Sequence, residues 1–293
     1  MKISGFSTAR YSTWYFLDQY KVLFDAGDGA AASLGPRCQN IQHVFLSHAD
    51  RDHLGGLLAL NHLGARADNP LRFYYPKDSS SFSDLLDFIE RFDASLPKSI
   101  WMPVEAGMRI KIDQQHVVEI GENDHIAMAT GNSTKQVKSL DFSLIERRKH
   151  LRAEFQGLGS DELKHLRALH GDTHITESVD YRLFGFSGDT PSFKTEQWRG
   201  TEVLIHEATF IAPDHGNRGH CELGDVLQAA GGLNLKALIV GHFSDRYDPE
   251  FIKASIRRLA RELAFDVPVF AVMPRVTQLD ILSSEPVWQG ICP

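Results

Sequence analysis

The stretch HVFLSHADRDHLGG, residues 43–56, places four potential metal ligands within six residues: His48, Asp50, Asp52 and His53. They directly follow an apolar run, 44–46, which predicts a buried strand, and a Gly-Gly pair with a Leu-rich helix comes after. Imidazole nitrogens and carboxylate oxygens are ligands that zinc, manganese and iron accept. The alternative is a solvated, charged turn with two unrelated histidines. That alternative would leave polar rings and carboxylates beside a core strand without partners, which is costly.

Composition places the chain among ordinary globular proteins. It has 293 residues, 42% of them hydrophobic, and a net charge of −7, which argues against a broad basic surface for nucleic acid but not against a local patch. Cys38, Cys221 and Cys292 have no paired spacing, so we expect reduced thiols and a cytoplasmic location. We also expect no membrane segment, because no stretch approaches the ~18 apolar residues that would span a bilayer.

Short strands alternate with helices along the whole chain. The clearest predicted strands are 21–24, 71–75, 140–146, 181–186, 203–207 and 237–240. Amphipathic helices are predicted at 81–92 and 251–263. With no repeat and no long linker, this pattern predicts an α/β protein of two sheets with helices outside, as a single domain over 1–293.

Further chemistry-bearing side chains stand at the end of predicted strands or just after them: Asp25, His125, Asp189, His206–Glu207 and His242. A carboxylate at the end of a buried strand either caps a helix or partners a charged group. For Asp25, capping of the helix 30–34 and a charged partner remain equally good readings.

Together these segments resemble the metallo-β-lactamase fold and, within it, the ribonuclease Z branch. The similar segments are LFDAGDG (23–29), FLSHADRDHLGGL (45–57), FYYPK (73–77), FSGDT (186–190), LIHEATF (204–210), GH (219–220) and GHFSDRY (241–247). They occur in the family order over nearly the whole chain. The resemblance implies a four-layer αββα sandwich and a ribonuclease Z-like, metal-dependent phosphodiesterase, with cleavage of precursor tRNA at its 3′ end as the activity of its nearest relatives.

The same resemblance implies two divalent metal ions, zinc in the first instance, and a hydroxide that they activate. Its implied ligands are His48, Asp50 and His125 for one ion, and Asp52, His53 and His242 for the other, with Asp189 bridging. Its implied catalytic residues are Asp52, His220 as proton donor, and Glu207 as the partner of His220. Asp25 would hold a ligand imidazole in one tautomer from outside the ligand set.

Two features depart from the family pattern. Asp50 stands where the pattern HxHxDH has a second histidine, and this harder ligand favours manganese or iron, or leaves one site weak. The family's tRNA-processing members carry a long Gly/Pro-rich arm, whereas residues 147–180 contain no proline and three glycines. We therefore expect this arm to be shortened or absent. The resemblance would imply a homodimer in which each arm reaches the other subunit, and without the arm this inference is lost.

A basic cluster could substitute in part for the arm by gripping phosphates: Arg147, Arg148, Lys149 and Arg152. A solvated face is the favoured reading of this cluster. Two rival functions stay open. One is hydrolysis of a small phosphodiester, such as a cyclic nucleotide, or of another ester or lactone. The other is a non-catalytic module that keeps a metal as a structural clip.

Overall fold

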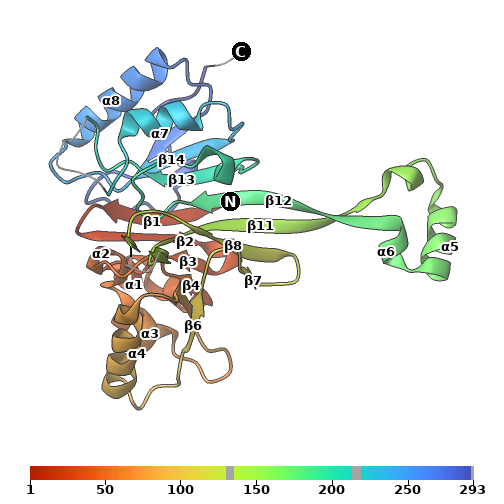
Figure 1. Ribbon diagram of the computed structural model, residues 1–293, viewed down its shortest axis with the longest axis horizontal. Coiled ribbons are helices and arrows are strands. Elements are labelled where there is room, and N and C mark those ends of the chain that lie inside the picture. Colours follow the sequence, from red (N-terminus) through yellow and green to blue (C-terminus); the bar gives the residue numbers. More distant parts are fainter. Residues whose placement is uncertain (130–134, 213–218, 292–293) are drawn as a thin grey trace.

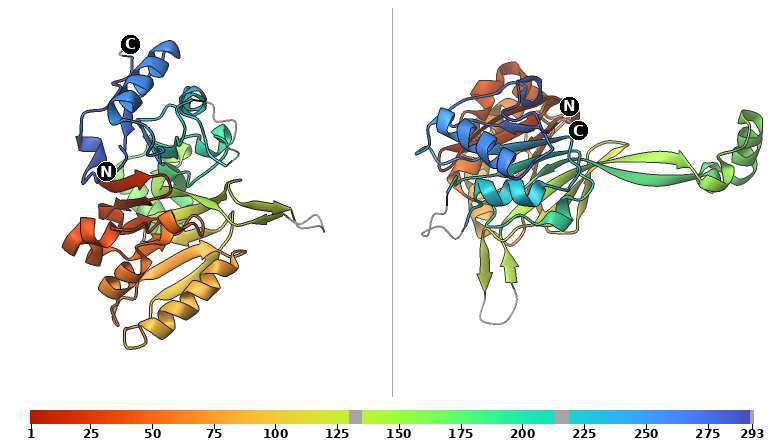
Figure 2. Two further views of the ribbon diagram at one scale, coloured as in Figure 1. Left: turned by 90° about the vertical axis from the view of Figure 1, so that its left-hand side faces the viewer. Right: turned by 90° about the horizontal axis from the view of Figure 1, so that it is seen from above.

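Two β-sheets pack face to face, and helices cover the outer face of each (Figures 1 and 2). The computed structural model describes residues 1–129, 135–212 and 219–291. The first sheet has six strands in chain order: β1 (Ile3–Thr8), β2 (Ser12–Leu17), β3 (Val22–Phe24), β4 (His43–Phe45), β5 (Arg72–Pro76) and β6 (Ile100–Val104). The pairs from β3 to β6 are parallel, so their carboxyl ends share one edge.

The second sheet has seven strands in the order β15 (Val269–Ala271), β14 (Ala237–Gly241), β13 (Val203–Glu207), β12 (Thr176–Phe186), β11 (Leu140–Leu151), β8 (His116–Glu122) and β7 (Arg109–Lys111). β12 to β15 pair in parallel, and β7, β8, β11 and β12 pair antiparallel. A separate two-stranded sheet pairs β9 (Ala127–Ala129) with β10 (Lys135–Val137).

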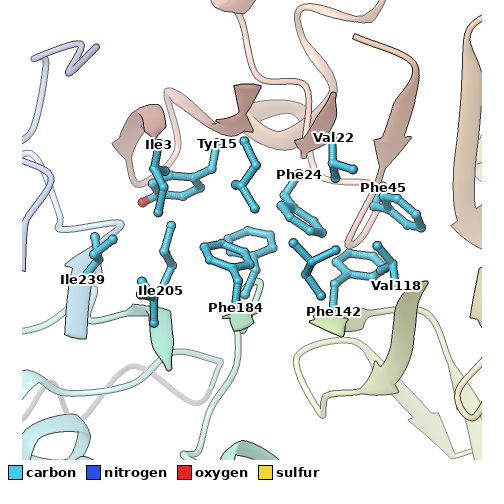
Figure 3. Close-up of a cluster of buried hydrophobic side chains, with 14 of the residues drawn as sticks. Ile3, Tyr15, Val22, Phe24, Phe45, Val118, Phe142, Phe184, Ile205 and Ile239 are labelled. Atoms are coloured by element: carbon cyan, nitrogen blue, oxygen red, sulfur yellow. The ribbon is translucent and has the colours of Figure 1, made fainter. Parts of the chain in front are cut away.

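The central core fills the space between the two sheets, as Figure 3 shows. Phe24 of the first sheet stacks on Phe142 and Phe184 of the second, with ring centroids 5.6 and 5.3 Å apart. Parallel strands buried on both faces need apolar side chains at successive positions. This requirement explains the uninterrupted apolar runs at 22–24 and 203–205, both of which lie in predicted strands.

Outer helices complete the four layers. The first sheet is covered by α1 (Ala30–Leu34), α3 (Leu57–Gly64) and α4 (Ser80–Phe92), and the second by α7 (Leu223–Ala230) and α8 (Pro249–Glu262). A short helix, α2 (Arg51–Leu54), follows the ligand-rich loop. The predicted αββα sandwich is confirmed.

An arm projects from this body, so the expectation that it could be absent is wrong (Figure 1). β11 and β12 run past the sheet as a two-stranded ribbon, paired from Glu146↔Tyr181 to Leu151↔Thr176. The tip carries α5 (Ser160–His170) and α6 (Asp172–Ile175). We call residues 146–181 the arm. The low content of Gly and Pro was no evidence against an arm, because a regular β-ribbon needs neither residue.

Side chains along the arm pair largely with one another. Arg147 forms an ion pair with Asp180 at 2.9 Å, and Lys149 forms one with Asp172 at 2.5 Å.

Cys38 and Cys221 are buried free thiols, and Cys292 lies outside the described residues. Across the three described ranges, no helix has the length and apolarity needed to cross a membrane.

Candidate metal centre

Loops at one edge of the two sheets bring the predicted ligands together. Asp25 follows β3, His48 follows β4, Asp189 follows β12, and His242 follows β14. Asp25 and His242 have positive φ values of 55° and 61°, a backbone conformation that costs about 1–3 kcal/mol in a residue other than glycine. Gly188 also has a positive φ, and a Cβ there would lie 3.0 Å from the Ser47 Cβ, so the two loops meet closely.

Asp189 lies at the middle of the centre. Its Oδ2 is 3.3 Å from Nε2 of His53, 3.3 Å from Nε2 of His242 and 3.8 Å from Nε2 of His48. Burial opposes ionisation of Asp189, but the charges of His242 and His53 hold its pKa well below the usual value. An ionised carboxylate therefore stands between the two predicted ligand groups.

The two groups lie on either side of Asp189. In the first, Asp50 Oδ2 is 3.6 Å from Nε2 of His48 and 3.8 Å from Nε2 of His125. In the second, Asp52 Oδ2 is 3.7 Å from Nε2 of His53 and 3.4 Å from Nε2 of His242. Within each group the ligand atoms lie within 4.8 Å of one another. The structure thus brings together all seven residues that the sequence pointed to.

Hydrogen bonds to Nδ1 orient the four imidazoles. His53 Nδ1 is 2.6 Å from Asp25 Oδ2, and His125 Nδ1 is 2.7 Å from the Gly219 carbonyl oxygen. These oxygens can only accept, so each Nδ1 carries the proton and donates it. The Nδ1 atoms of His48 and His242 lie 2.9 and 2.8 Å from the hydroxyls of Ser47 and Thr209.

Both hydroxyls in turn donate to buried carboxylates. Ser47 Oγ donates to Asp25 Oδ2 at 2.8 Å, and Thr209 Oγ1 donates to Glu207 Oε2 at 2.5 Å. Each hydroxyl has one proton, so it must accept from the neighbouring Nδ1. In the neutral form of each of these four rings, the nitrogen without a proton is therefore Nε2, which faces the centre. Asp25 caps no helix, because Gly29 occupies the N-cap position of α1.

This donor set fits divalent metal ions. Nε2 of His48 and of His53 is fully buried and has no hydrogen-bond partner among the described residues. Lone pairs of nitrogen and of carboxylate oxygen face one another across 3.3–3.8 Å, an arrangement that repels unless a cation or protons lie between them. Nitrogen and oxygen donors in such clusters suit zinc, manganese or iron.

His220 lies at the rim of the centre and is partly exposed. Its Nδ1 is 3.0 Å from Glu207 Oε1 and 3.8 Å from Asp189 Oδ2. Burial disfavours the charged ring, but the hydrogen bond and charge of Glu207 outweigh it and raise the pKa of His220 to about 9. His220 is therefore a protonated imidazole at neutral pH, held by a buried carboxylate.

Ser47 and Thr209 are the residues that sequence reasoning missed. Their only signal was position: Ser47 directly precedes the predicted ligand His48, and Thr209 stands two residues after Glu207. The four basic residues predicted to grip phosphates do not reach the centre, because Arg147, Arg148 and Lys149 lie along the arm and Arg152 follows β11.

A cavity of about 250 Å³ does reach the centre, and it is lined by residues of the centre and by Arg10 and Arg246.

No family model matches the chain. The chain is 26% identical to ribonuclease Z of Brevibacillus brevis over 258 residues, which cover 78% of this chain and 77% of that protein. It is 23% identical to tRNase Z TRZ1 of Arabidopsis thaliana over 269 residues, covering 88% and 90% of the two chains.

Solved structures agree on the fold. The metallo-β-lactamase fold protein YhfI from Bacillus subtilis matches with a TM-score of 0.58 at 13% identity, covering 95% of this chain and 99% of that one. Zn²⁺-bound PqqB from Methylobacterium extorquens matches with a TM-score of 0.60 at 11% identity and the same coverage. The fold and the site define a metal-dependent hydrolase of the metallo-β-lactamase fold. Within that class, the similarity in sequence makes the chain a ribonuclease Z-like hydrolase.

Proposed function

We propose that this chain hydrolyses a phosphodiester bond of RNA, with precursor tRNA as substrate, and that it works with two divalent metal ions. The observation that carries the proposal is the convergence of two ligand groups on Asp189, with Nε2 of His48 and of His53 lacking a hydrogen-bond partner among the described residues. Relatives named ribonuclease Z and tRNase Z support RNA as the substrate class. The proposed ligands are His48, Asp50 and His125 on one side and Asp52, His53 and His242 on the other, with Asp189 shared.

A pair of divalent ions bound there would lower the pKa of a water molecule and stabilise both the attacking and the leaving oxygen of a phosphoryl displacement. Asp52 is suited to orient that water and accept its proton. Burial opposes ionisation of Asp52, but the hydrogen bond with His242 and the charge of His53 hold its pKa at about 2. The backbone N–H of Arg10 also donates to Asp52 Oδ2 at 2.8 Å, which fixes the carboxylate in place.

His220 is suited to protonate the leaving oxygen. Its Nδ1 is occupied by Glu207, so the remaining ring nitrogen is the one that can donate to substrate. Glu207 acts through His220 and holds it in the charged form. Proton acceptance by Asp52 and proton donation by His220 thus fall to two groups whose pKa values their surroundings drive apart.

The position of Asp50 is relevant to the choice of metal and to the alternative of a non-catalytic metal-binding module. The side chain is 54% exposed, yet its Oδ2 faces Nε2 of both His48 and His125. This position supports Asp50 as a ligand and makes the first site more anionic than one with three histidines. We propose zinc as the native metal, with manganese or iron as the alternative that Asp50 favours.

The arm supports RNA over a small diester. A small phosphodiester would be favoured if the arm were absent, and the ribbon of β11 and β12 removes that reason. Arg148 lies 4.6 Å over the Tyr181 ring on this arm, so a cation and an aromatic face are offered together. We propose that the arm contacts the RNA backbone, with its basic residues positioned by the acidic ones beside them.

The test compares an in vitro transcribed precursor tRNA with bis(p-nitrophenyl) phosphate, using protein whose metal content has been measured. We expect cleavage of both substrates, inhibition by chelators, and two metal ions per chain. Turnover of the small ester without cleavage or salt-sensitive binding of tRNA would contradict the RNA proposal. A single metal per chain with no turnover of either substrate would support the structural-clip reading.

We also propose a homodimer, since an arm that projects from the body can reach a second copy (Figure 1). Light scattering should give about twice the mass of 32.9 kDa, and a chain with residues 152–175 replaced by a short turn should shift toward the monomer. A monomeric mass for the full chain would contradict the dimer and leave the hydrolase proposal standing.

A further inference from the structure

The cavity of the metal centre opens into a second, larger cleft at the turn between β1 and β2. The inner cavity and the outer cleft share four lining residues: Ala9, Arg10, Ser244 and Arg246. The outer cleft measures about 610 Å³ and adds Tyr11 and Asp245 to its lining. A volume of this size can hold a nucleotide next to the bond that reacts in the inner cavity.

Tyr11 presents its ring to solvent in the wall of this cleft, with 63% of the residue exposed. Its turn is tightly fixed: the Tyr11 N–H donates to the Thr8 carbonyl at 3.0 Å, and the Ala9 N–H donates to the Phe243 carbonyl at 3.3 Å. The next link runs to the centre itself, from the Arg10 N–H to Asp52. The backbone that carries Tyr11 is therefore held at a set position relative to a predicted metal ligand, so only the side chain has to be ordered on binding.

The charges of the outer cleft suit an anion. Arg10 is exposed, and within the described ranges its guanidinium forms no ion pair or hydrogen bond. Arg246 lies 5.0 Å over the Phe210 ring and donates from Nε to Ser244 at 3.0 Å, which holds its guanidinium at the rim. The acidic residue of the cleft, Asp245, is neutralised by Arg275 at 3.0 Å.

We propose that this outer cleft is a nucleotide subsite, in which Tyr11 stacks on the base next to the scissile phosphate while Arg10 and Arg246 contact the neighbouring phosphate. The inference rests on the proposed function and names the group that the substrate must carry. A planar base is the ligand that an exposed phenol ring on a fixed turn selects, and a second phosphate is what two adjacent guanidinium groups select. A polynucleotide supplies both at one backbone spacing.

The test pairs a change in the protein with a change in the substrate. Precursor tRNA is assembled with an abasic nucleotide on one or the other side of the mapped cleavage site. For the wild type, kcat/KM should fall about tenfold with the abasic substrate on one side, the loss expected for one base–aromatic stack. Tyr11→Ala should show the same loss on the normal substrate and no further loss on the abasic one, whereas Tyr11→Phe should retain activity.

Phe92→Ala is the matched control, because Phe92 is 69% exposed on α4 and lines neither cavity. Equal losses for Tyr11→Ala on normal and abasic substrates would overturn the stacking role. Arg10→Gln should flatten the salt dependence of RNA binding by about one counterion, and an unchanged slope would remove Arg10 from the subsite.

A binding measurement separates this inference from the proposed function. A single-stranded RNA trinucleotide containing 2-aminopurine is titrated with metal-loaded protein. Quenching by the wild type and by Tyr11→Phe but not by Tyr11→Ala supports the subsite, even if neither RNA nor bis(p-nitrophenyl) phosphate is hydrolysed. Absence of quenching by the wild type overturns the subsite, and turnover of the ester would still uphold the hydrolase.

Discussion

Two buried carboxylates, one from each sheet, organise the centre in the same way. Asp25, after β3, binds His53 directly at 2.6 Å and reaches His48 through the Ser47 hydroxyl. Glu207, at the end of β13, binds His220 directly at 3.0 Å and reaches His242 through the Thr209 hydroxyl. Each carboxylate thus orients one imidazole by a direct hydrogen bond and a second imidazole through a bridging hydroxyl.

The two arrangements differ in what they hold. Both imidazoles governed by Asp25 are fully buried, and both are predicted ligands. Glu207 governs one predicted ligand and one rim histidine whose side chain is 23% exposed. We therefore propose that the Asp25 network serves metal binding alone, whereas the Glu207 network couples metal binding to proton donation. Substitutions on the two sides should separate these roles.

The largest effect is expected for Asp25→Ala. Without this carboxylate, His53 loses its acceptor and the Ser47 hydroxyl loses its own, so two imidazoles lose their fixed tautomer. We expect metal affinity to fall about a hundredfold, near the upper end for partners of metal-bound histidines. Competition with a chromogenic chelator measures this directly, and unchanged affinity in a folded variant would show that the Asp25 network does not serve binding.

Glu207→Gln should instead lower kcat, by about tenfold to a hundredfold, with a smaller loss of metal. In the wild type, His220 donates only while protonated, so kcat should fall as pH rises through its pKa of about 9. Without the negative charge of Glu207, the protonated form of His220 is less stable and the pKa of His220 falls. The alkaline limb of the pH–rate profile should therefore move to lower pH. A pH–rate profile checks the sign. A limb that stays in place would separate Glu207 from proton donation.

The two hydroxyl links offer a matched pair. Thr209→Val should weaken metal binding by about tenfold through His242, and Ser47→Ala should do the same through His48. Thr209→Ser keeps the hydroxyl and should retain the wild-type metal affinity. If the loss in Thr209→Val came from altered packing, the serine variant would not retain that affinity. Isothermal titration of the metal-free protein distinguishes the two sides if their ions bind with different enthalpies. Loss in the valine variant without rescue by serine would point to packing.

Asp50→His tests the ligand that departs from the family pattern. Replacing a carboxylate by an imidazole should raise the zinc-to-manganese preference by about fivefold, because nitrogen is the softer donor. Elemental analysis after dialysis against equal concentrations of both ions gives the ratio. An unchanged ratio, with unchanged activity, would place Asp50 outside the coordination sphere.

The smallest effect is expected on the arm, outside both carboxylate networks. Lys149→Ala removes an exposed ion pair with Asp172, so thermal stability should not change. The slope of RNA affinity against salt should decrease by about one. Lys236→Ala, which breaks a similar exposed pair on the body, is the control and should leave that slope as it is. Equal slopes for both variants would remove Lys149 from RNA contact.

Most of the predicted ligand set could be proposed from the sequence because several of its members, such as His48, Asp189 and His242, follow a buried strand. Apolar runs such as 44–46 and 237–240 predict strands and so place His48 and His242 at strand ends, whereas only the resemblance to a known family placed the two histidines in one centre. Asp25 was left between helix cap and charged partner, because strand position alone does not say which neighbour a carboxylate meets. The arm was missed because the count of glycines and prolines is no measure of a regular ribbon.

The amino-acid sequence by itself determined the layer architecture and the residues of the centre, since hydrophobic periodicity and ligand type are properties of local segments. Only the tertiary structure decided how those residues are held. The links from Ser47 to Asp25, from Thr209 to Glu207 and from Arg10 to Asp52 join segments that no local pattern connects. Hydrogen bonds of this kind depend on directions and distances of a few ångström, which packing of the two sheets sets.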